Sequence, residues 1–445
     1  MALIEQTPAT REQPGGLRAT ARERLDLADV RAFALSSPGR LIVMALVLIG
    51  VCFAAGSVTA AMVSDRQQAL DILLDDTEPD ANSAHRLYTS LSIADAAAST
   101  AFIAGGLEPQ GVRDRYAQAV GEAAAELVTQ PGHGTGPGNA DVRLRTGIAT
   151  GLPVYTGLIE TARANNRSGH PVGAAYLSEA SNQMQATLLP MAEDLQNHRS
   201  AAVDAAQRHH VQPPWTAIAL LLLALGALTW VQFELARRWR RVLNPGLLVA
   251  SAAMLILLAW TVIAGTISAA AMIDGRDEGA VPASRLTESR ILTQQARSAE
   301  TLKLARRDAT GDYDRTYETS VARVNELLSG YPKDAPAADA VTNARAALNR
   351  WRVAHQRMND TLAKGDFVGA SLVATGPGAA DADAQVNALD NALDQGIITT
   401  RNNLRGNISQ AARILDFLAP GAMGLGILAA VSVGIGLWPR LREYR

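Results

Sequence analysis

Four long apolar segments, each free of Asp, Glu, Lys and Arg, constrain this chain more than any other feature. They occupy residues 41–63, 215–233, 247–273 and 417–438. Each has roughly the 20 apolar residues that a helix needs to cross the hydrocarbon core of a bilayer. The pattern therefore predicts an integral membrane protein with four transmembrane helices.

The spans divide the rest of the chain into two long polar segments and three short ones. The long segments together hold most of the residues, which explains why the mean hydropathy is only +0.04. The predicted domains are an N-terminal tail (1–40), a first span (41–63), a first helical bundle (64–214), a second span (215–233), a basic linker (234–246), a third span (247–273), a second helical bundle (274–416), a fourth span (417–438) and a C-terminal tail (439–445).

Arginines beside the spans predict the orientation of the chain. Arg237, Arg238, Arg240 and Arg241 lie in the short linker between the second and third spans, and further arginines precede the first span and follow the fourth. Short cytoplasmic segments of membrane proteins carry such an excess of Lys and Arg. We therefore expect both termini in the cytoplasm, both long segments outside, and a multi-pass protein of the plasma membrane.

The long segments have the composition of helical bundles. They are rich in Ala, Leu, Gln, Glu and Arg and poor in aromatic residues, which favours helix. In the first segment, breakers at Gly105-Gly106, in the glycine-rich stretch 131–138 and at Ser168–Pro171 separate four expected helices. One buried face is expected at Tyr116, Val120, Ala123, Ala124 and Leu127. The predicted fold is an all-α membrane protein with two tandem extracytoplasmic four-helix bundles.

The second long segment repeats the plan of the first at an offset of about 200 residues. Gly169, followed by Val172-Gly173-Ala174, matches Gly365, followed by Val368-Gly369-Ala370. In both copies this pattern predicts a helix end at the first glycine and a new helix whose small residues pack closely on a neighbour. The second copy departs at residues 374–378, where either a kinked fourth helix or a longer turn is expected.

Motifs for catalysis or cofactor binding are not found in the sequence. The single cysteine, Cys52, lies inside the first span, and the seven histidines are scattered apart from the pair His209-His210. Neighbouring residues on a helix point in different directions, so this pair is a poor metal site. Phosphate-binding glycine loops and metalloprotease or nucleophile motifs are also missing. We expect a non-enzymatic protein with no cofactor and no metal, and the near-neutral charge argues against nucleic acid as a partner.

Small residues form a strip along the fourth span. They are Ala422, Gly426, Ala430 and Gly434, one on each successive helical turn. Strips of this kind let the backbones of two membrane helices approach closely. The strip therefore predicts a helix-packing seam, either static or able to slide, with Gly56 and Gly265 as further contact points in the entering spans.

A sensor function explains all these features better than the alternative functions do. Helices that run from an exterior bundle into the membrane can transmit a small displacement, because packed helices have discrete arrangements. Ionisable residues, which coupled transport usually requires within the membrane, are missing from the four spans. An oligomeric channel or transport accessory protein and a structural membrane tether remain the alternatives. A homodimer is the expected oligomer of such a sensor.

The tandem units of span, bundle and span, with short inner segments and an Ala/Arg-rich sequence, resemble the actinobacterial GlnX-type membrane sensor proteins. The resemblance is one of architecture over the whole chain. It implies a relay in which a GlnH-like solute-binding lipoprotein senses aspartate or glutamate outside. The state of that protein would reach a PknG-like serine/threonine kinase in the cytosol.

The distal loops of the two bundles are the expected docking sites for such a binding protein, because they are exposed and far from lipid. The candidate residues there are Gly105, Gly106, Glu108, Arg167, His170, Arg306, Arg307, Asp308, Lys364 and Asp366. On the cytoplasmic side, the arginines of residues 237–241 are the candidates for contact with a kinase.

Overall fold

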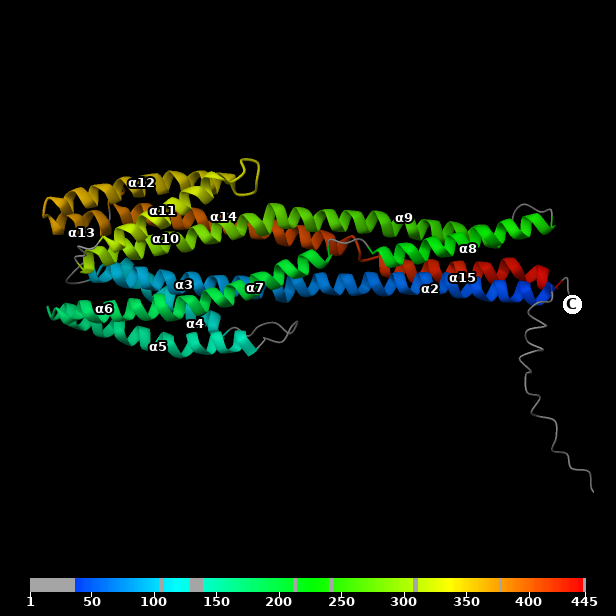
Figure 1. Ribbon diagram of the computed structural model, residues 1–445, viewed down its shortest axis with the longest axis horizontal. Coiled ribbons are helices and arrows are strands. Elements are labelled where there is room, and N and C mark those ends of the chain that lie inside the picture. The colour runs from blue at the N-terminus through cyan, green and yellow to red at the C-terminus, as the bar shows by residue number, and fades with distance from the viewer. Residues whose placement is uncertain are drawn as a thin grey trace, which may run out of the picture. The chain divides into compact units, whose positions relative to one another are not determined.

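The computed structural model describes residues 37–103, 108–128, 139–210, 214–239, 244–306, 311–376 and 378–442. Every regular element in these ranges is a helix, and they contain no strand (Figure 1). Four helical stretches are long and apolar enough to cross a membrane: Gly39–Ile103, Trp215–Arg237, Pro245–Arg306 and Ala382–Pro439. The all-α membrane fold expected from the sequence is confirmed.

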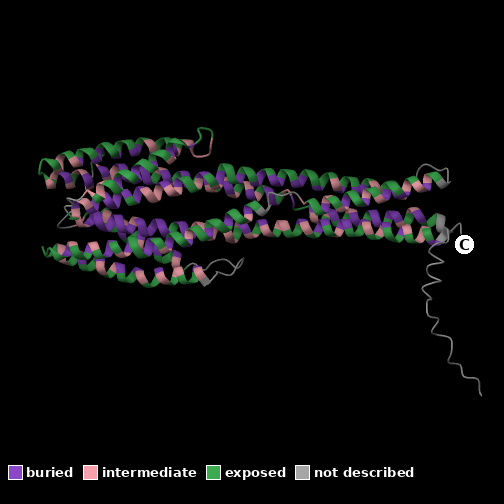
Figure 2. Ribbon diagram, viewed as in Figure 1, coloured by how far each residue is buried: buried purple, intermediate pink, exposed green. Residues whose placement is uncertain are grey.

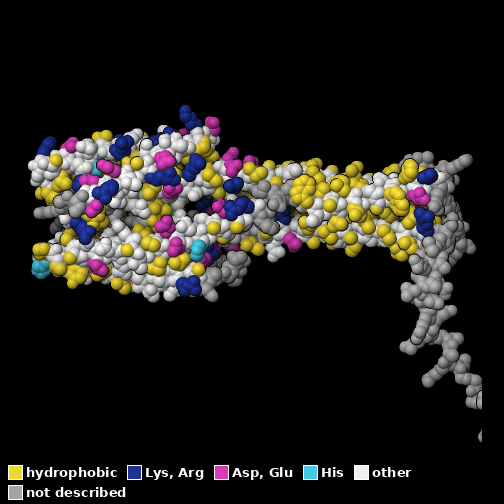
Figure 3. Space-filling model, viewed as in Figure 1, with side chains coloured by type: hydrophobic (Ala, Val, Ile, Leu, Met, Phe, Trp, Pro, Cys, Tyr) yellow, Lys and Arg dark blue, Asp and Glu magenta, His cyan; other side chains and the backbone are white. Residues whose placement is uncertain are grey.

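The chain divides into two compact units. The first, which we call the membrane unit, comprises residues 1–59, 216–259 and 421–445. It is built from most of α8 (Trp215–Trp239) and α15 (Leu418–Arg442) and the adjoining parts of α2 (Ser37–Ile72) and α9 (Pro245–Asp274). Large apolar side chains such as Leu46, Leu222 and Ile435 are more than half exposed on it. Hydrophobic side chains cover its visible face, as expected of a surface in contact with lipid (Figure 3).

The small-residue strip of α15 packs against α2 at one very close crossing. A Cβ atom added to Gly56 would lie 2.7 Å from the Cα of Gly426 and 3.0 Å from the carbonyl oxygen of Ala422. A second close crossing joins α9 to α15, where a Cβ on Gly246 would lie 2.4 Å from the Cα of Gly436. Both crossings depend on glycine because any side chain would meet backbone atoms of the neighbouring helix.

Replacing Gly426 with valine is expected to weaken the α2–α15 crossing by about 1–3 kcal/mol, the usual cost of overpacking a tight contact. Gly424→Val is the matched control. It adds the same side chain to the same helix, but at a position where no other atom would lie within 4 Å of the added Cβ. Thermal unfolding of the full chain in detergent should show a lower midpoint for Gly426→Val alone. Equal midpoints for the two variants would contradict a packing role for this glycine.

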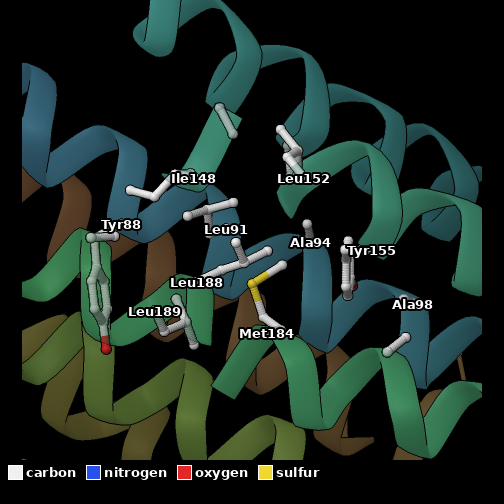
Figure 4. Packing of buried hydrophobic residues seen from close by; sticks show 14 of the residues in the cluster. Tyr88, Leu91, Ala94, Ala98, Ile148, Leu152, Tyr155, Met184, Leu188 and Leu189 are labelled. Atoms are coloured by element: carbon white, nitrogen blue, oxygen red, sulfur yellow. The ribbon is translucent and has the colours of Figure 1, made fainter. Parts of the chain in front are cut away.

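The first bundle consists of four antiparallel helical stretches. They are α3 (Glu78–Ile103), α4 (Gln110–Val128), α5 (Asn139–Arg167) and the continuous run of α6 (Val172–Gln183), the π-helical segment η2 (Met184–Leu188) and α7 (Leu189–His210). Its core contains Leu91 from α3, Ile148 and Tyr155 from α5, and Met184 and Leu188 from η2, which meet between the helices in Figure 4.

The face of α4 that was expected to be buried is only partly so. Tyr116 and Ala123 are buried, and Val120 and Leu127 pack against the core. Ala124, however, is exposed, so the prediction for this residue is wrong. The core-facing stripe of α4 is narrower than the apolar pattern suggested, because alanine is small enough to occupy either face of a helix at little cost.

The second bundle is built in the same way. It comprises α10 (Val281–Arg306), α11 (Asp312–Ser329), α12 (Ala338–Ala363), and the pair α13 (Phe367–Thr375) and α14 (Ala382–Arg413). Its core surrounds the fully buried Trp351 of α12. The interruption expected at residues 374–378 is a full break, since α13 ends at Thr375 and α14 begins at Ala382.

Glycines end the third helix of both bundles in the expected way. Gly169 and Gly365 have φ values of 72° and 80°, a left-handed conformation that glycine adopts without strain. After the turn, a Cβ on Gly173 would lie 3.0 Å from the carbonyl oxygen of Ala162. The shared pattern of the two copies thus has the structural meaning that the sequence predicted.

Within the described ranges, three π-helical segments interrupt the α-helices, and each ends two residues before a proline. They are η1 (Leu73–Thr77), η2 and η3 (Gly275–Ala280), which precede Pro79, Pro190 and Pro282. In each case the residue before the proline donates its N–H to a carbonyl five residues back. Proline lacks an N–H and crowds the carbonyl four residues back, so a wider turn accommodates it. Because η1 and η3 hold matching places in the two copies, they belong to the repeated plan.

Candidate functional site at the interface of the two bundles

The two bundles pack together within the second compact unit, residues 60–215 and 260–420, through their first helices α3 and α10. From Ser83 onward α3 is buried on almost every face, and α10 is buried on most faces between Thr293 and Leu304 (Figure 2). A helix with neighbours all round usually carries apolar side chains. Here the interface is instead rich in Ser, Thr, Gln and charged side chains, so its polar groups must bond to one another.

Asp95 of α3 lies at the middle of this interface. Its Oδ2 accepts hydrogen bonds from Ser181 (3.2 Å) and Gln185 (3.2 Å) of the first bundle and from Ser298 (3.1 Å) of the second. Its Oδ1 has no donor among the described residues. Burial raises the pKa of Asp95 to about 6, and these hydrogen bonds offset only part of that effect. The carboxyl group therefore ties three helices together and changes charge near neutral pH.

Glu78, the first residue of α3, joins the two bundles by ion pairs. Its carboxylate accepts hydrogen bonds from Arg401 and, at 2.6 Å, from Arg405, both on α14. Arg405 also donates to the carbonyl oxygen of Leu74 in η1, at 3.0 Å. The Glu78 side chain is 5% exposed, while the side chains of Arg401 and Arg405 are 31% and 37% exposed, so the carboxylate alone is largely shielded from solvent. A shielded carboxylate depends on its arginine partners being present.

Arg290 of α10 forms a second ion-pair cluster, within the second bundle. It donates to Asp390 at 2.9 and 3.0 Å and pairs with Asp394, and Gln294 also donates to Asp390. Burial opposes ionisation of Asp390, but the charge of Arg290 outweighs it and lowers the pKa of that carboxyl. The cluster fixes α10 against α14.

Glu300 organises a buried polar network in the core of the second bundle. Its carboxylate accepts hydrogen bonds from Arg297 (2.8 Å) and Trp351 (3.2 Å) and contacts Nδ1 of His355 at 2.8 Å. Asn359 lies 3.0 Å from Nε2 of His355, and the amide oxygen of Asn359 accepts from a lysine. The Asn359 amide nitrogen is therefore the donor to Nε2, which leaves the Nδ1 proton of His355 for Glu300.

The interface of the two bundles also contains cavities. One of about 330 Å³ is lined by Glu78, Arg401 and His85, among others. Burial lowers the pKa of His85 to about 4, an effect that the charges of nearby arginines increase, so this histidine is neutral at physiological pH. Two further cavities, of about 270 and 400 Å³, lie along the α3–α10 pair.

The predicted outer docking residues have unequal surroundings. Arg167, His170, Arg306 and Lys364 are exposed. Glu108 pairs with Arg163 at 3.1 Å and is only 12% exposed, and Asp366 caps α13 by accepting from the Gly369 N–H at 2.8 Å. These last two side chains have structural roles. Gly105, Gly106, Arg307 and Asp308 lie outside the described residues.

The predicted cytoplasmic residues belong to the end of α8 and the linker after it. Arg237 is exposed, and Arg238 is helical, with its side chain outside the description. Arg240 and Arg241 lie outside the described residues. Over the described ranges, three or more His, Cys, Asp or Glu side chains never gather in a way that could hold a metal ion.

Comparison with known proteins supports a sensing role. No curated protein and no solved structure matches the chain. A family model does match, over a range that runs from the end of α2 to the end of α7 and so covers the first bundle. Residues 69–208 match the actinobacterial sensor domain, and this match supports a sensor protein from actinobacteria.

Proposed function

We propose that this chain is a non-enzymatic transmembrane sensor relay. It passes the state of a GlnH-like amino-acid-binding protein outside the cell to a PknG-like serine/threonine kinase in the cytosol. Both termini are cytoplasmic and both bundles extracytoplasmic in this proposal. The family match supports the sensing part, and the architecture of the helices supports the relay.

One observation carries the proposal: the two helices that pair the bundles are continuous with membrane-spanning segments. The stretches Gly39–Ile103 and Pro245–Arg306 are each helical throughout. The returning helices are less regular, since Pro214 between α7 and α8 is not helical and a turn at Ile414–Phe417 lies between α14 and α15 within the stretch Ala382–Pro439. A change at the α3–α10 interface would thus reach the membrane chiefly through the two entering helices.

Charge reversal at the outer loops tests the relay. In co-purification from native membranes, the double variant Arg306→Glu/Lys364→Glu should recover much less of an aspartate-binding lipoprotein than the wild type does. The reason is that the charges of two exposed basic side chains are reversed. Lys333→Glu is the matched control, since Lys333 is exposed in the loop at the other end of α11 and α12.

Arg237→Glu tests the cytoplasmic side of the relay in the same membranes, with recovery of the kinase as its measurement. Recovery of the lipoprotein by the Arg306→Glu/Lys364→Glu variant at the wild-type level would contradict docking at these loops. Ion flux through the purified chain in liposomes would favour the channel alternative.

A further inference from the structure

A cavity of about 400 Å³ lies between the bundles beside Arg115, which has no hydrogen-bond or ion-pair partner among the described residues. Its walls come from α3 and α4 of the first bundle and from α10 and α14 of the second. The polar side chains that line it include Arg115, Gln294, Arg297, Asp383 and Asn387, and alanines and valines supply much of the rest. Its volume suits a molecule of the size of an amino acid.

Arg115 is the exceptional residue of this cavity. It is half-buried in α4 and makes no hydrogen bond or ion pair with any described residue, unlike the other buried arginines of the interface. Burial lowers its pKa, and nearby Asp390 and Asp383 act in the opposite direction without touching it. A guanidinium that loses part of its hydration without gaining a partner is destabilised, and a bound anion would relieve that cost.

The other charges around the cavity are already matched. Arg297 pairs with Asp383 at 3.0 Å and with Glu300 at 2.8 Å, and Arg290 pairs with two aspartates. Asp383 also accepts a hydrogen bond from Asn387 at 3.0 Å. The charge of Arg115 is therefore the one that awaits a counter-ion from outside the described chain.

We propose that this cavity binds a small monocarboxylate, of the amino-acid or hydroxy-acid class, through bidentate hydrogen bonds from Arg115 to the carboxylate of the ligand. Guanidinium and carboxylate groups match in this geometry. A dianion such as phosphate is disfavoured because Asp383 and Asp390 repel its second charge. An ammonium or hydroxyl group is favoured, because Asp383 and Asn387 bring acceptor oxygens to the same cavity.

The related cavity in the other half of the interface lacks this feature. It has a volume of about 270 Å³ and is lined by α10 and α11 of the second bundle and α3 and α7 of the first. When Tyr116 is aligned with Tyr317, the position of Arg115 falls on Thr316, and the acidic side chains Asp95 and Glu193 line that cavity. The matching cavity therefore does not repeat the arginine, and we expect one ligand per chain.

The site would make the paired bundles responsive to a small molecule directly. Its walls contain Arg297 and Asp383, which connect α10 to α14, and residues of α3 and α4. A ligand there contacts both bundles at once and so favours one spacing of α3 and α10 over another. This goes beyond the proposed relay and holds whether or not a binding protein docks outside.

Calorimetric titration of the purified full chain in detergent tests the site without any partner protein. The probes are sodium lactate, glycine and sodium phosphate at matched ionic strength. We expect saturable binding of lactate or glycine at one site per chain, at least tenfold weaker in Arg115→Gln and unchanged in Arg113→Gln. Arg113 is the matched control because it is exposed two residues earlier on α4.

Three outcomes would overturn the proposal: no binding of either monocarboxylate probe to the wild type, equal binding to Arg115→Gln, or equally tight Arg115-dependent binding of phosphate. Arg115→Gln removes a half-buried charge that has no partner among the described residues, so it is expected to fold. If circular dichroism shows that it does not, Arg115→Lys serves instead, because it keeps the charge and loses the bidentate hydrogen bonds. Failure of the calorimetric titration would not contradict docking of the lipoprotein. Failure of the co-purification would likewise not contradict ligand binding in this cavity.

Discussion

Replacing Glu300 with alanine is expected to lower the free energy of unfolding of the full chain by about 3–5 kcal/mol, the usual cost of removing one member of a buried ion pair. The carboxylate is inaccessible to solvent and serves Arg297, Trp351 and His355 together. Alanine would leave the buried indole N–H and imidazole N–H without an acceptor. Urea titration in detergent micelles, followed by the helical circular dichroism signal, measures the loss.

Glu288→Ala is the matched control for Glu300→Ala. Glu288 lies on the same helix and pairs with Arg323 at 2.9 Å, but both side chains are nearly half exposed. Exposed pairs contribute about 0–1 kcal/mol because water screens them. A loss at Glu300 no larger than the loss at Glu288 would show that the network does not hold the second bundle together.

The acidity of Glu300 adds a pH dependence to this prediction. Burial alone would raise its pKa, but the hydrogen bond from His355 and the charge of Arg297 outweigh burial, so the pKa of Glu300 lies below its ordinary value. A carboxyl whose pKa is lowered by folding stabilises the protein above its unfolded-state pKa. This contribution should be lost as the pH falls through the folded-state pKa, and Glu300→Gln should not lose it.

The helices and their ends could be predicted from the sequence because their signals are local. Stretches of about 20 apolar residues identify the membrane helices, since a bilayer imposes that length. Gly169 and Gly365 mark helix ends, because glycine adopts the left-handed turn without strain. Gly426 could be picked out in the same way, since a strip of small residues has few uses in a membrane helix other than close packing.

The π-helical segments were not predicted, although a signal for them exists. Pro79, Pro190 and Pro282 each stand inside an apparently helical stretch, two residues after a π segment. Pro153 stands inside α5 with no such segment beside it. An internal proline is therefore a reason to expect a local irregularity, and packing decides which form it takes.

The interface of the two bundles could not be predicted, because it depends on contacts between residues about 200 positions apart. Arg113 and Arg115 look equivalent in the sequence, yet only Arg115 reaches the cavity. Asp95 and Glu300 likewise look like surface residues of helices, where acidic side chains are common. Their burial follows from the pairing of α3 with α10 and from the packing of the second bundle, and neither arrangement leaves a local pattern.

Replacing Asp95 with asparagine is expected to stabilise the full chain at pH 7 by about 3 kcal/mol and to change its stability little at pH 4. The pKa of Asp95 is raised to about 6 in the folded protein, chiefly by burial. The unfolded chain loses this proton near pH 4. Between these values the folded state binds more protons, so stability falls as the pH rises, by about 1.4 kcal/mol per pH unit. Asparagine keeps the shape and an acceptor oxygen without the buried charge.

The measurement is the difference in free energy of unfolding between wild type and Asp95→Asn at pH 4, 5, 6, 7 and 8, by urea titration in detergent micelles. The difference should grow from pH 4 to about pH 6 and then stay constant, because above that pH both folded and unfolded Asp95 are ionised. Asp114→Asn on α4 is the control, since Asp114 is exposed and its side chain stays in water on folding. A difference that does not vary with pH would mean that Asp95 keeps its charge in the folded interface at no cost. In that case a hydrogen bond to Oδ1, from a protein group or from water, must stabilise the charged carboxylate in addition to the three donors at Oδ2.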